Sequence, residues 1–322
     1  FRSLLEDDGV EMGEHAFNGT PLIKDPFESE TNYNWVVIGD SGSGKSYQTK
    51  LNALRTRAVK ENTKVIILDP MQGFNGIAKA MGAKRITLGG SRGLNPLEIR
   101  APTEASRRAA GEDIDPLSEK IRDVMSFFDN FAHREGIDLG PERMTLTTAI
   151  TEAYARKGIT TDLDTHSNPS PTLVDVLDVL EEMATEPEEF IVRIESEAEE
   201  IAANATDLIN LFRPFIDGQY QNLAEPSEFD LRDEDVVYLD LSQQEKRQSG
   251  GGLMMQLVFS LVYERAKETT DNVVFIIDEA RFLMRDAANL EFLGQRVRHS
   301  RHYDTSIRFI TQEVNDFFDH EE

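Results

Sequence analysis

Residues 34–46 read Asn-Trp-Val-Val-Ile-Gly-Asp-Ser-Gly-Ser-Gly-Lys-Ser, and this stretch decides the fold. Its first part is a short apolar run of the kind that forms a buried strand, and its last eight residues match the pattern G-x-x-x-x-G-K-[ST]. Residues 47–59 follow with a helical pattern. A strand, a glycine-rich loop and a helix in this order predict a phosphate-binding loop, a P-loop, in an α/β domain.

The residue types in this loop suit nucleotide chemistry. Glycines allow a tight turn whose backbone N–H groups surround phosphate oxygens, and the helix that follows adds a favourable dipole. Lys45 reaches the β- and γ-phosphates, and Ser46 offers a hydroxyl to Mg²⁺. A dinucleotide-binding loop is the obvious competitor, but its G-x-G-x-x-G spacing is missing. We therefore expect ATP and Mg²⁺ as cofactors, bound by Gly39, Asp40, Ser41, Gly42, Ser43, Gly44, Lys45, Ser46 and Tyr47.

A second motif lies at 273–279, where an apolar run ends in Asp278-Glu279. A strand of this kind places Asp278 at the carboxyl edge of the sheet, where it can hold Mg²⁺ through water. Glu279 is then the natural base that polarises the attacking water. The plain alternative is that the two acids only begin a surface helix, as acids often do. The P-loop upstream favours the catalytic interpretation.

The last part of the chain offers further catalytic candidates. A helical run at 290–303 precedes an apolar strand at 306–310, which ends in Thr311-Gln312. Gln312 is placed to sense the γ-phosphate. Arg298 and Arg301 precede the strand, and each is a candidate arginine finger for a neighbouring subunit's nucleotide or a surface arginine paired with an acid. Asp69-Pro70 either borders the site or only ends a strand.

Five apolar runs without alternation predict a mainly parallel sheet covered on both faces: 35–38, 64–68, 236–241, 273–277 and 306–310. Between the second and third runs lie four helical patterns, at 117–131, 143–157, 172–183 and 188–212. Pro171-Thr172, with Asp175 three residues on, is typical of a helix start. We expect an α/β core at 1–101 and 223–322 and an inserted all-α subdomain at 102–222.

The composition narrows the function further. The 322 residues contain no cysteine, which excludes disulfides and thiolate metal sites, and no stretch is long and apolar enough for a transmembrane segment. Asp and Glu total 59 against 11 Lys and 23 Arg, a net charge of −25. Such a lysine-poor acidic surface predicts a protein from a salt-loving organism, with an acidic mesophilic protein as the alternative, and it lacks a broad footprint for nucleic acid. The first residue is Phe, so we expect a piece of a longer protein.

With these motifs the chain resembles the conjugative type IV secretion ATPases of the TraC-like kind, in the HerA–FtsK branch of RecA-type P-loop motors. The resemblance extends over most of the chain. One departure is Arg281, which stands where the family usually has an aromatic residue after Asp-Glu-Ala. The stretches that carry the resemblance are NWVVIGDSGSGKS, VIILDP, ITLGGSRGLNPLEI, PTLVDVL, LFRPFIDGQYQNL, IIDEARFLM and ITQ.

The resemblance implies a RecA-like P-loop core and an ATP-hydrolysing motor that energises conjugative transfer, type IV secretion or pilus assembly. The acidic composition alone places this motor in a halophilic archaeon. The resemblance also implies a homohexamer at the cytoplasmic face of the membrane, with secretion-channel proteins as partners and a separate N-terminal domain that this chain lacks. DNA stays open as a further partner. The alternatives are a DNA translocase, helicase or viral genome-packaging ATPase, and a nucleotide-dependent assembly module without turnover.

Overall fold

The computed structural model describes residues 5–29, 31–87, 93–101, 115–190, 195–218, 220–227, 234–242, 251–267, 269, 271–284, 293–294 and 296–317. The chain divides into two compact units. The core unit consists of Phe1–Leu88 and Leu231–Glu322, and the inserted unit is Gly89–Asp230. The inserted unit is therefore wider than the segment 102–222 that we expected, because it includes the Asn95-Pro96-Leu97 stretch.

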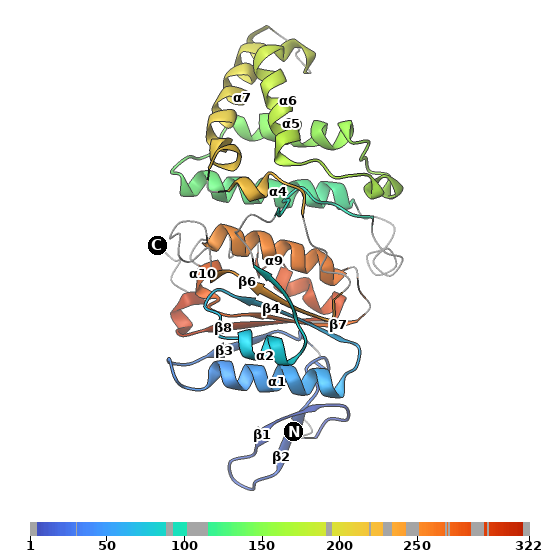
Figure 1. Cartoon of the computed structure of the whole chain (residues 1–322), viewed down its shortest axis with the longest axis vertical. Coiled ribbons are helices and arrows are strands. Elements are labelled where there is room, and N and C mark those ends of the chain that lie inside the picture. The colour runs from blue at the N-terminus through green and yellow to red at the C-terminus, as the bar shows by residue number, and fades with distance from the viewer. Residues whose placement is uncertain are drawn as a thin grey trace. The chain divides into compact units, whose positions relative to one another are not determined.

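The core unit is built on a six-stranded sheet in which every neighbouring pair is parallel. Helices cover it from both sides, with α1 (Lys45–Val59) and α2 (Asn75–Ala80) on one face and α9 (Gly251–Lys267) on the other (Figure 1). The five predicted strands are confirmed, and β5 is an addition at the edge. In spatial order the strands are β3 (Trp35–Ile38), β8 (Thr305–Thr311), β7 (Asn272–Ile277), β4 (Thr63–Asp69), β6 (Val236–Asp240) and β5 (Lys84–Thr87).

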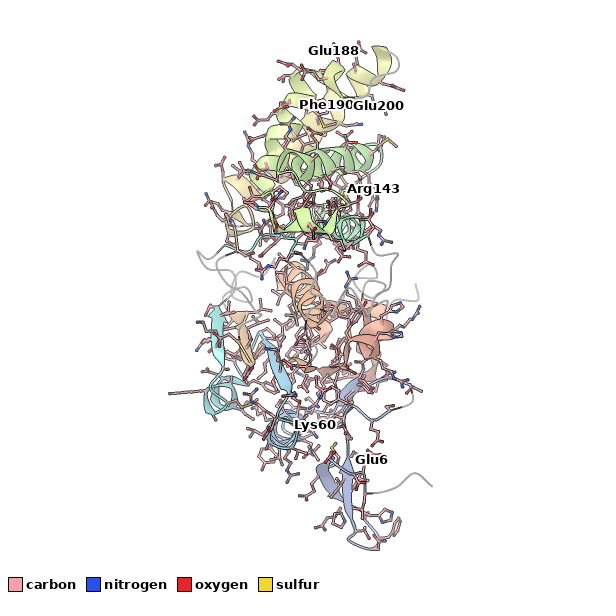
Figure 2. The ribbon with its side chains drawn as sticks, turned by 90° about the vertical axis from the view of Figure 1, so that its right-hand side faces the viewer. Glu6, Lys60, Arg143, Glu188, Phe190 and Glu200 are labelled. Carbon is pink, nitrogen blue, oxygen red and sulfur yellow. The ribbon has the colours of Figure 1, made fainter. Side chains whose placement is uncertain are left out.

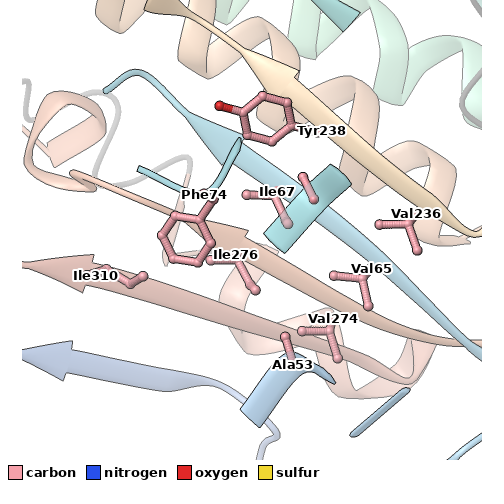
Figure 3. Close-up of a cluster of buried hydrophobic side chains, with 10 residues drawn as sticks. Ala53, Val65, Ile67, Phe74, Val236, Tyr238, Val274, Ile276 and Ile310 are labelled. Carbon is pink, nitrogen blue, oxygen red and sulfur yellow. The ribbon is translucent and has the colours of Figure 1, made fainter. Parts of the chain in front are cut away.

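The centre of the sheet forms the hydrophobic core of this unit (Figure 3). Strands β4, β7 and β6 contribute side chains that are almost wholly buried against α1 and α2. The edge strand β3 is different, because Val36 and Ile38 are 51% and 40% exposed. The expectation that all five strands are covered on both faces is therefore wrong for β3. The cluster drawn in Figure 3 is Ala53, Val65, Ile67, Phe74, Ala78, Val236, Tyr238, Val274, Ile276 and Ile310.

A hairpin that the sequence did not predict precedes the sheet. Its strands β1 (Val10–Glu14) and β2 (Pro21–Lys24) pair in antiparallel fashion. The hairpin packs on α1, where Arg55 Nη1 donates to the carbonyl oxygen of Glu11 at 2.6 Å. The segment after β2 is tied to the same helix by an ion pair of 2.6 Å between Lys60 and Asp25. Figure 2 labels Lys60 at the end of α1.

The regular secondary structure in the described residues of the inserted unit consists of α-helices and 3-10 turns only. Six aromatic side chains from α4, α7 and the turn after α7 pack together in its core: Phe127, Phe128, Phe131, Phe212, Phe215 and Tyr220. The predicted start of α6 is confirmed, because the backbone N–H of Thr172 donates to Asp175 Oδ2 at 2.7 Å. The helices are α4 (Pro116–Arg134), α5 (Glu142–Arg156), α6 (Leu173–Thr185) and α7 (Glu195–Ile216).

The two ends of the inserted unit are joined to each other. The backbone N–H of Leu94 donates to the carbonyl oxygen of Asn222 at 2.9 Å. A Cβ at Gly93 would collide with the carbonyl oxygen of Pro226, so this close approach requires glycine. Asn95 is buried and donates to the carbonyl oxygen of Pro171 at 2.8 Å. The Asn-Pro-Leu stretch therefore anchors the start of the unit.

Short elements complete the described chain. None of the helices in the described residues combines the length and the apolar character needed to cross a membrane. Among the glutamates on the surface of the inserted unit are Glu188 and Glu200, which Figure 2 labels. The remaining elements are α10 (Arg281–Met284) and the 3-10 turns η1 (Leu163–Ser167), η2 (Pro187–Glu189), η3 (Gln221–Leu223), η4 (Ser300–Tyr303) and η5 (Val314–Phe317).

Candidate nucleotide-binding site

The loop between β3 and α1 is tight, and its conformation explains its glycines. Gly42 and Gly44 have φ of +82° and +93°, in the left-handed region that side chains disfavour. A Cβ at Gly39 would lie 2.7 Å from Ser43 Oγ, closer than real contacts allow. The loop is also exposed from Ser41 to Gly44. It therefore has the curvature and the access that a phosphate group needs.

The amino end of α1 is left open to an external anion. The helix has no acidic residue in its first turn and no side-chain cap, so its first backbone N–H groups are not neutralised from within the helix. Lys45 Nζ donates to the carbonyl oxygens of Gly39 and Asp40 at 2.6 and 3.2 Å, which holds the ammonium against the loop. Tyr47 is 71% exposed beside it.

The strand order brings the predicted catalytic groups to the carboxyl edge of the sheet, which is the side where the parallel strands end. Strand β8 lies between β3 and β7, with Ile38 opposite Thr311 and Ile277 opposite Phe309. Because all three strands are parallel, the P-loop, Gln312 and Asp278-Glu279 all follow carboxyl ends at this edge. The structure thus brings together the groups from the two motifs and from the final strand.

Asp278 lies in an environment that suits a cation. Its side chain is 7% exposed, and burial together with the nearby charge of Asp69 raises its pKa to about 6. The backbone N–H of Glu279 and the charge of Lys50 act in the opposite direction. A divalent cation would offset this crowding of carboxylates. The described residues contain no group of three or more His, Cys, Asp or Glu that could hold a metal ion by itself. Mg²⁺ bound with nucleotide commonly needs only one or two protein ligands.

Glu279 has an unusual backbone conformation. Its φ is +48°, a left-handed conformation that costs a non-glycine residue roughly 1–2 kcal/mol. Gln312 Nε2 donates to Glu279 Oε1 at 3.0 Å, so the predicted sensor and the predicted base are in contact. Arg281 Nε lies 3.0 Å from Glu279 Oε2. The sequence marked Arg281 only as a departure from the family pattern, and it gave no sign of this contact.

The two candidate arginine fingers lie elsewhere. Arg301 lies over the ring of Tyr33, 5.8 Å from its centroid, and its Nη1 is 3.5 Å from the carbonyl oxygen of Thr31. Arg298 is exposed. Both precede β8, whose seven residues span about 20 Å, so both are at the opposite edge of the sheet from the P-loop. The structure does not bring them to the site of their own chain.

Asp69 and its neighbours add to the site several residues whose role the sequence did not define. Asp69 is fully buried and ends β4; its Oδ2 accepts from the backbone N–H of Phe74 at 2.7 Å and from the hydroxyl of Tyr238 at 2.9 Å. It therefore stabilises the turn and also faces Asp278 electrostatically. Lys50 lies 4.9 Å from the Phe74 ring centroid. A lone lysine in a helix carries no sequence signal for such a place.

A second buried carboxylate, Asp240, lies at the same edge of the sheet. It accepts from the backbone N–H of Ser242 at 3.0 Å, from Gln72 Nε2 at 3.2 Å and from Arg85. Burial would raise the pKa of Asp240, but the hydrogen bonds from Ser242 and Arg85 outweigh it and lower that pKa. Asp240 is therefore a paired anion that supports the edge.

Known proteins share this fold. VirB4 of Thermoanaerobacter pseudethanolicus is 24% identical, with a TM-score of 0.77 over 99% of this chain and 80% of that one. The plasmid coupling protein TrwB, solved with a non-hydrolysable ATP analogue, is 15% identical, with a TM-score of 0.53 over 98% of this chain and 70% of that one. The architecture is thus an α/β RecA-like P-loop core with a parallel sheet, as predicted.

The sequence itself also matches a curated protein. Protein TraC of Escherichia coli strain K12 is 26% identical over 302 residues, which cover 90% of this chain. The chain spans 30% of the length of TraC. No protein-family model matches the sequence. The predicted resemblance to the conjugative type IV secretion ATPases is confirmed, in sequence by TraC and in fold by VirB4 and TrwB.

Proposed function

We propose that this chain hydrolyses ATP and acts as a motor that energises conjugative transfer, type IV secretion or pilus assembly. The observation that carries this proposal is the order of groups along one sheet edge. The P-loop follows β3, Gln312 follows β8 and Asp278-Glu279 follows β7. A phosphate loop with an acid pair two strands away supports hydrolysis rather than mere nucleotide storage. The similarity to TraC supports the secretion context.

Each group has one role in this proposal. Lys45 offsets negative charge on the phosphate oxygens, and Ser46 and Asp278 hold Mg²⁺. TrwB, which has been solved with ADP and Mg²⁺, supports this choice of cofactors. Bound Mg²⁺–ATP supplies the phosphoryl group, and the cation offsets the charge that develops on it. Glu279 takes the proton of the attacking water, and Gln312 orients the Glu279 carboxylate that it contacts.

The working form in this proposal is a homohexamer at the cytoplasmic face of the membrane, bound to secretion-channel proteins. The position of Arg298 and Arg301 at the far edge of the sheet supports a role in a neighbouring subunit's site rather than in their own. Light scattering with and without ATP tests the assembly. Mixing Arg301→Ala subunits with Glu279→Gln subunits tests the shared site, because mixed rings then contain some intact sites and regain activity.

The experiment that tests the function is steady-state ATP hydrolysis in molar KCl, with and without single- and double-stranded DNA. Lys45→Ala serves as the blank. A rate that disappears in this variant and is indifferent to DNA supports a secretion or pilus motor acting on protein partners. A several-fold rise with DNA supports a translocase that grips DNA. Nucleotide binding without any turnover contradicts the proposal and points to an assembly module.

A further inference from the structure

Both carboxylate oxygens of Glu279 are contacted by side chains of its own chain. Gln312 Nε2 donates to Oε1 at 3.0 Å, and Arg281 Nε lies 3.0 Å from Oε2. The first contact joins two residues that already have roles in the proposed function. The second brings in Arg281, which has none.

The turn after β7 fixes this contact. The backbone N–H of Ala280 donates to the carbonyl oxygen of Ile310 at 2.9 Å, and that of Phe282 donates to the carbonyl oxygen of Glu279 at 3.1 Å. Together with the left-handed φ of Glu279, these bonds form a turn that leads directly from the strand into α10. Arg281 then begins α10, and its guanidinium comes back onto the carboxylate two residues before it.

The two atoms in contact are closed to solvent. Glu279 Oε2 and Arg281 Nε are both buried, and within the described part of the chain neither has a hydrogen bond of normal geometry. Their attraction is therefore that of two opposite charges without an aligned N–H. A general base needs a lone pair within reach of the proton that it takes. While Arg281 is in place, Oε2 has no access to water, and Oε1 carries the amide of Gln312.

Arg281 has freedom to move away. Its side chain is 36% exposed, against 17% for Glu279, and its guanidinium also lies 5.2 Å from the ring centroid of Phe282. Misaligned and partly exposed ion pairs are weak. We propose that Arg281 is a positioning residue that restrains Glu279 in a resting arrangement, and that turnover requires Oε2 to leave Arg281. This inference rests on the proposed function, since it takes Glu279 as the base.

Arg281→Gln tests the restraint through the rate. A misaligned and partly exposed ion pair contributes on the order of 1 kcal/mol, which corresponds to a factor of about five, so we expect kcat to rise about two- to fivefold. KM and the affinity for a fluorescent ATP analogue stay unchanged, because Arg281 is outside the P-loop. Arg281→Lys keeps a cation beside Oε2 and stays near the wild-type rate. The matched control is Arg57→Gln, an arginine of similar exposure paired with Asp235, which leaves kcat unchanged.

A second readout does not depend on activity. Unfolding free energies of the nucleotide-free Arg281→Gln, Glu279→Gln and double variants form a cycle whose coupling energy differs from zero if the two side chains attract each other. A fall in kcat for Arg281→Gln, a rise in kcat for Arg281→Lys as large as that for Arg281→Gln, or a zero coupling overturns the restraint but leaves the ATPase intact. A wild-type rate equal to that of Lys45→Ala removes the proposed function, and the restraint with it.

Discussion

The core unit carries 22 Lys and Arg against 29 Asp and Glu, whereas the inserted unit carries 12 against 30, so the net charges are −7 and −18. Their interiors differ in the opposite sense. In the core unit Asp69, Asp240, Asp278 and Arg308 are buried. In the described part of the inserted unit, Lys120 is the only buried side chain among Asp, Glu, Lys and Arg.

The difference separates two uses of charge. Buried ionised groups are expensive unless they are paired, so the core unit gives up stability at the sheet edge where the proposed chemistry takes place. The inserted unit keeps its charges in water and fills its interior with aromatic and aliphatic side chains. Substitutions in the core unit should therefore separate activity from stability, and substitutions in the inserted unit should affect stability alone.

The largest expected effect is on turnover. Glu279→Gln removes the proposed base but keeps the size of the side chain, so kcat should fall about 10²- to 10⁴-fold. Binding of a fluorescent ATP analogue should be kept. The free energy of unfolding should fall only by the small contribution of the Arg281 pair, since the amide still contacts Gln312. Near-wild-type hydrolysis in this variant would show that another group activates water.

The next effect concerns the interior of the inserted unit. Phe215 is fully buried and its ring lies 4.6 Å from that of Phe131. Phe215→Ala leaves a cavity among these rings, and the free energy of unfolding should fall by about 3–5 kcal/mol. Chemical denaturation measures the loss. The control is Phe17→Ala in the hairpin loop, where the ring is 95% exposed and its removal should have no measurable effect.

A buried charge in the core unit should respond in the opposite direction. Arg308 is fully buried on β8, over the ring of Trp35. Among the described residues, only Asn52 accepts from it, at 2.5 Å, and Nε and Nη2 have no hydrogen-bond partner. Arg308→Met removes these unpaired donors, so stability should rise by about 1–3 kcal/mol. A clear loss of stability in chemical denaturation would mean that the guanidinium is better paired than its contacts indicate.

The pH dependence of stability gives an independent check on Arg308. Burial lowers the pKa of this guanidinium from its usual value to about 9. Between these values the unfolded chain binds a proton that the folded chain has released, so stability should rise with pH in this window. The Arg308→Met variant should lack this rise. Equal slopes in the two proteins would show that Arg308 stays charged in the fold.

The smallest effect belongs to the surface of the inserted unit. Arg156 on α5 makes two bonds to Glu182 on α6, at 2.7 and 2.6 Å, and both side chains are well exposed. Arg156→Met should cost at most about 1 kcal/mol, because exposed pairs are weak and screened by salt. The cost should shrink further in molar KCl, which denaturation at two salt concentrations measures. A loss as large as that of Phe215→Ala would remove the distinction between interior and surface in this unit.

Much of the fold is predictable from local pattern. The P-loop strand and the four other apolar runs can be recognised in the sequence because buried parallel strands are continuously apolar. The strand β5 and the hairpin escape this rule, since Ile86 is the only buried residue of β5 and Val10 the only one of the hairpin strands. Edge elements with one buried side chain leave no pattern in the sequence.

The site is predictable only in part, for a related reason. Lys45, Ser46 and Asp278-Glu279 lie in motifs whose order along the chain determines their place at the sheet edge. The contact between Glu279 and Arg281 instead depends on a left-handed backbone at a glutamate, which residue preference does not indicate. Arg298 and Arg301 are far from the site of their own chain because they precede β8, which runs parallel to β3. The sequence alone does not show this direction, since it depends on how the strands pair.

The bond between Leu94 and Asn222 has a consequence for how the chain folds during synthesis. The pair Val65 and Val236 in the sheet centre is separated by 171 residues, so β4 waits for β6 until the inserted unit has been made. The helices of that unit mostly contact their sequence neighbours, and local contacts form fast. Once Leu94 meets Asn222, the loop left to close is about fourfold shorter, which saves about 1 kcal/mol of chain entropy. The inserted unit, once folded, thus holds the two segments that lead to β4 and β6 close together, which favours the pairing of these strands.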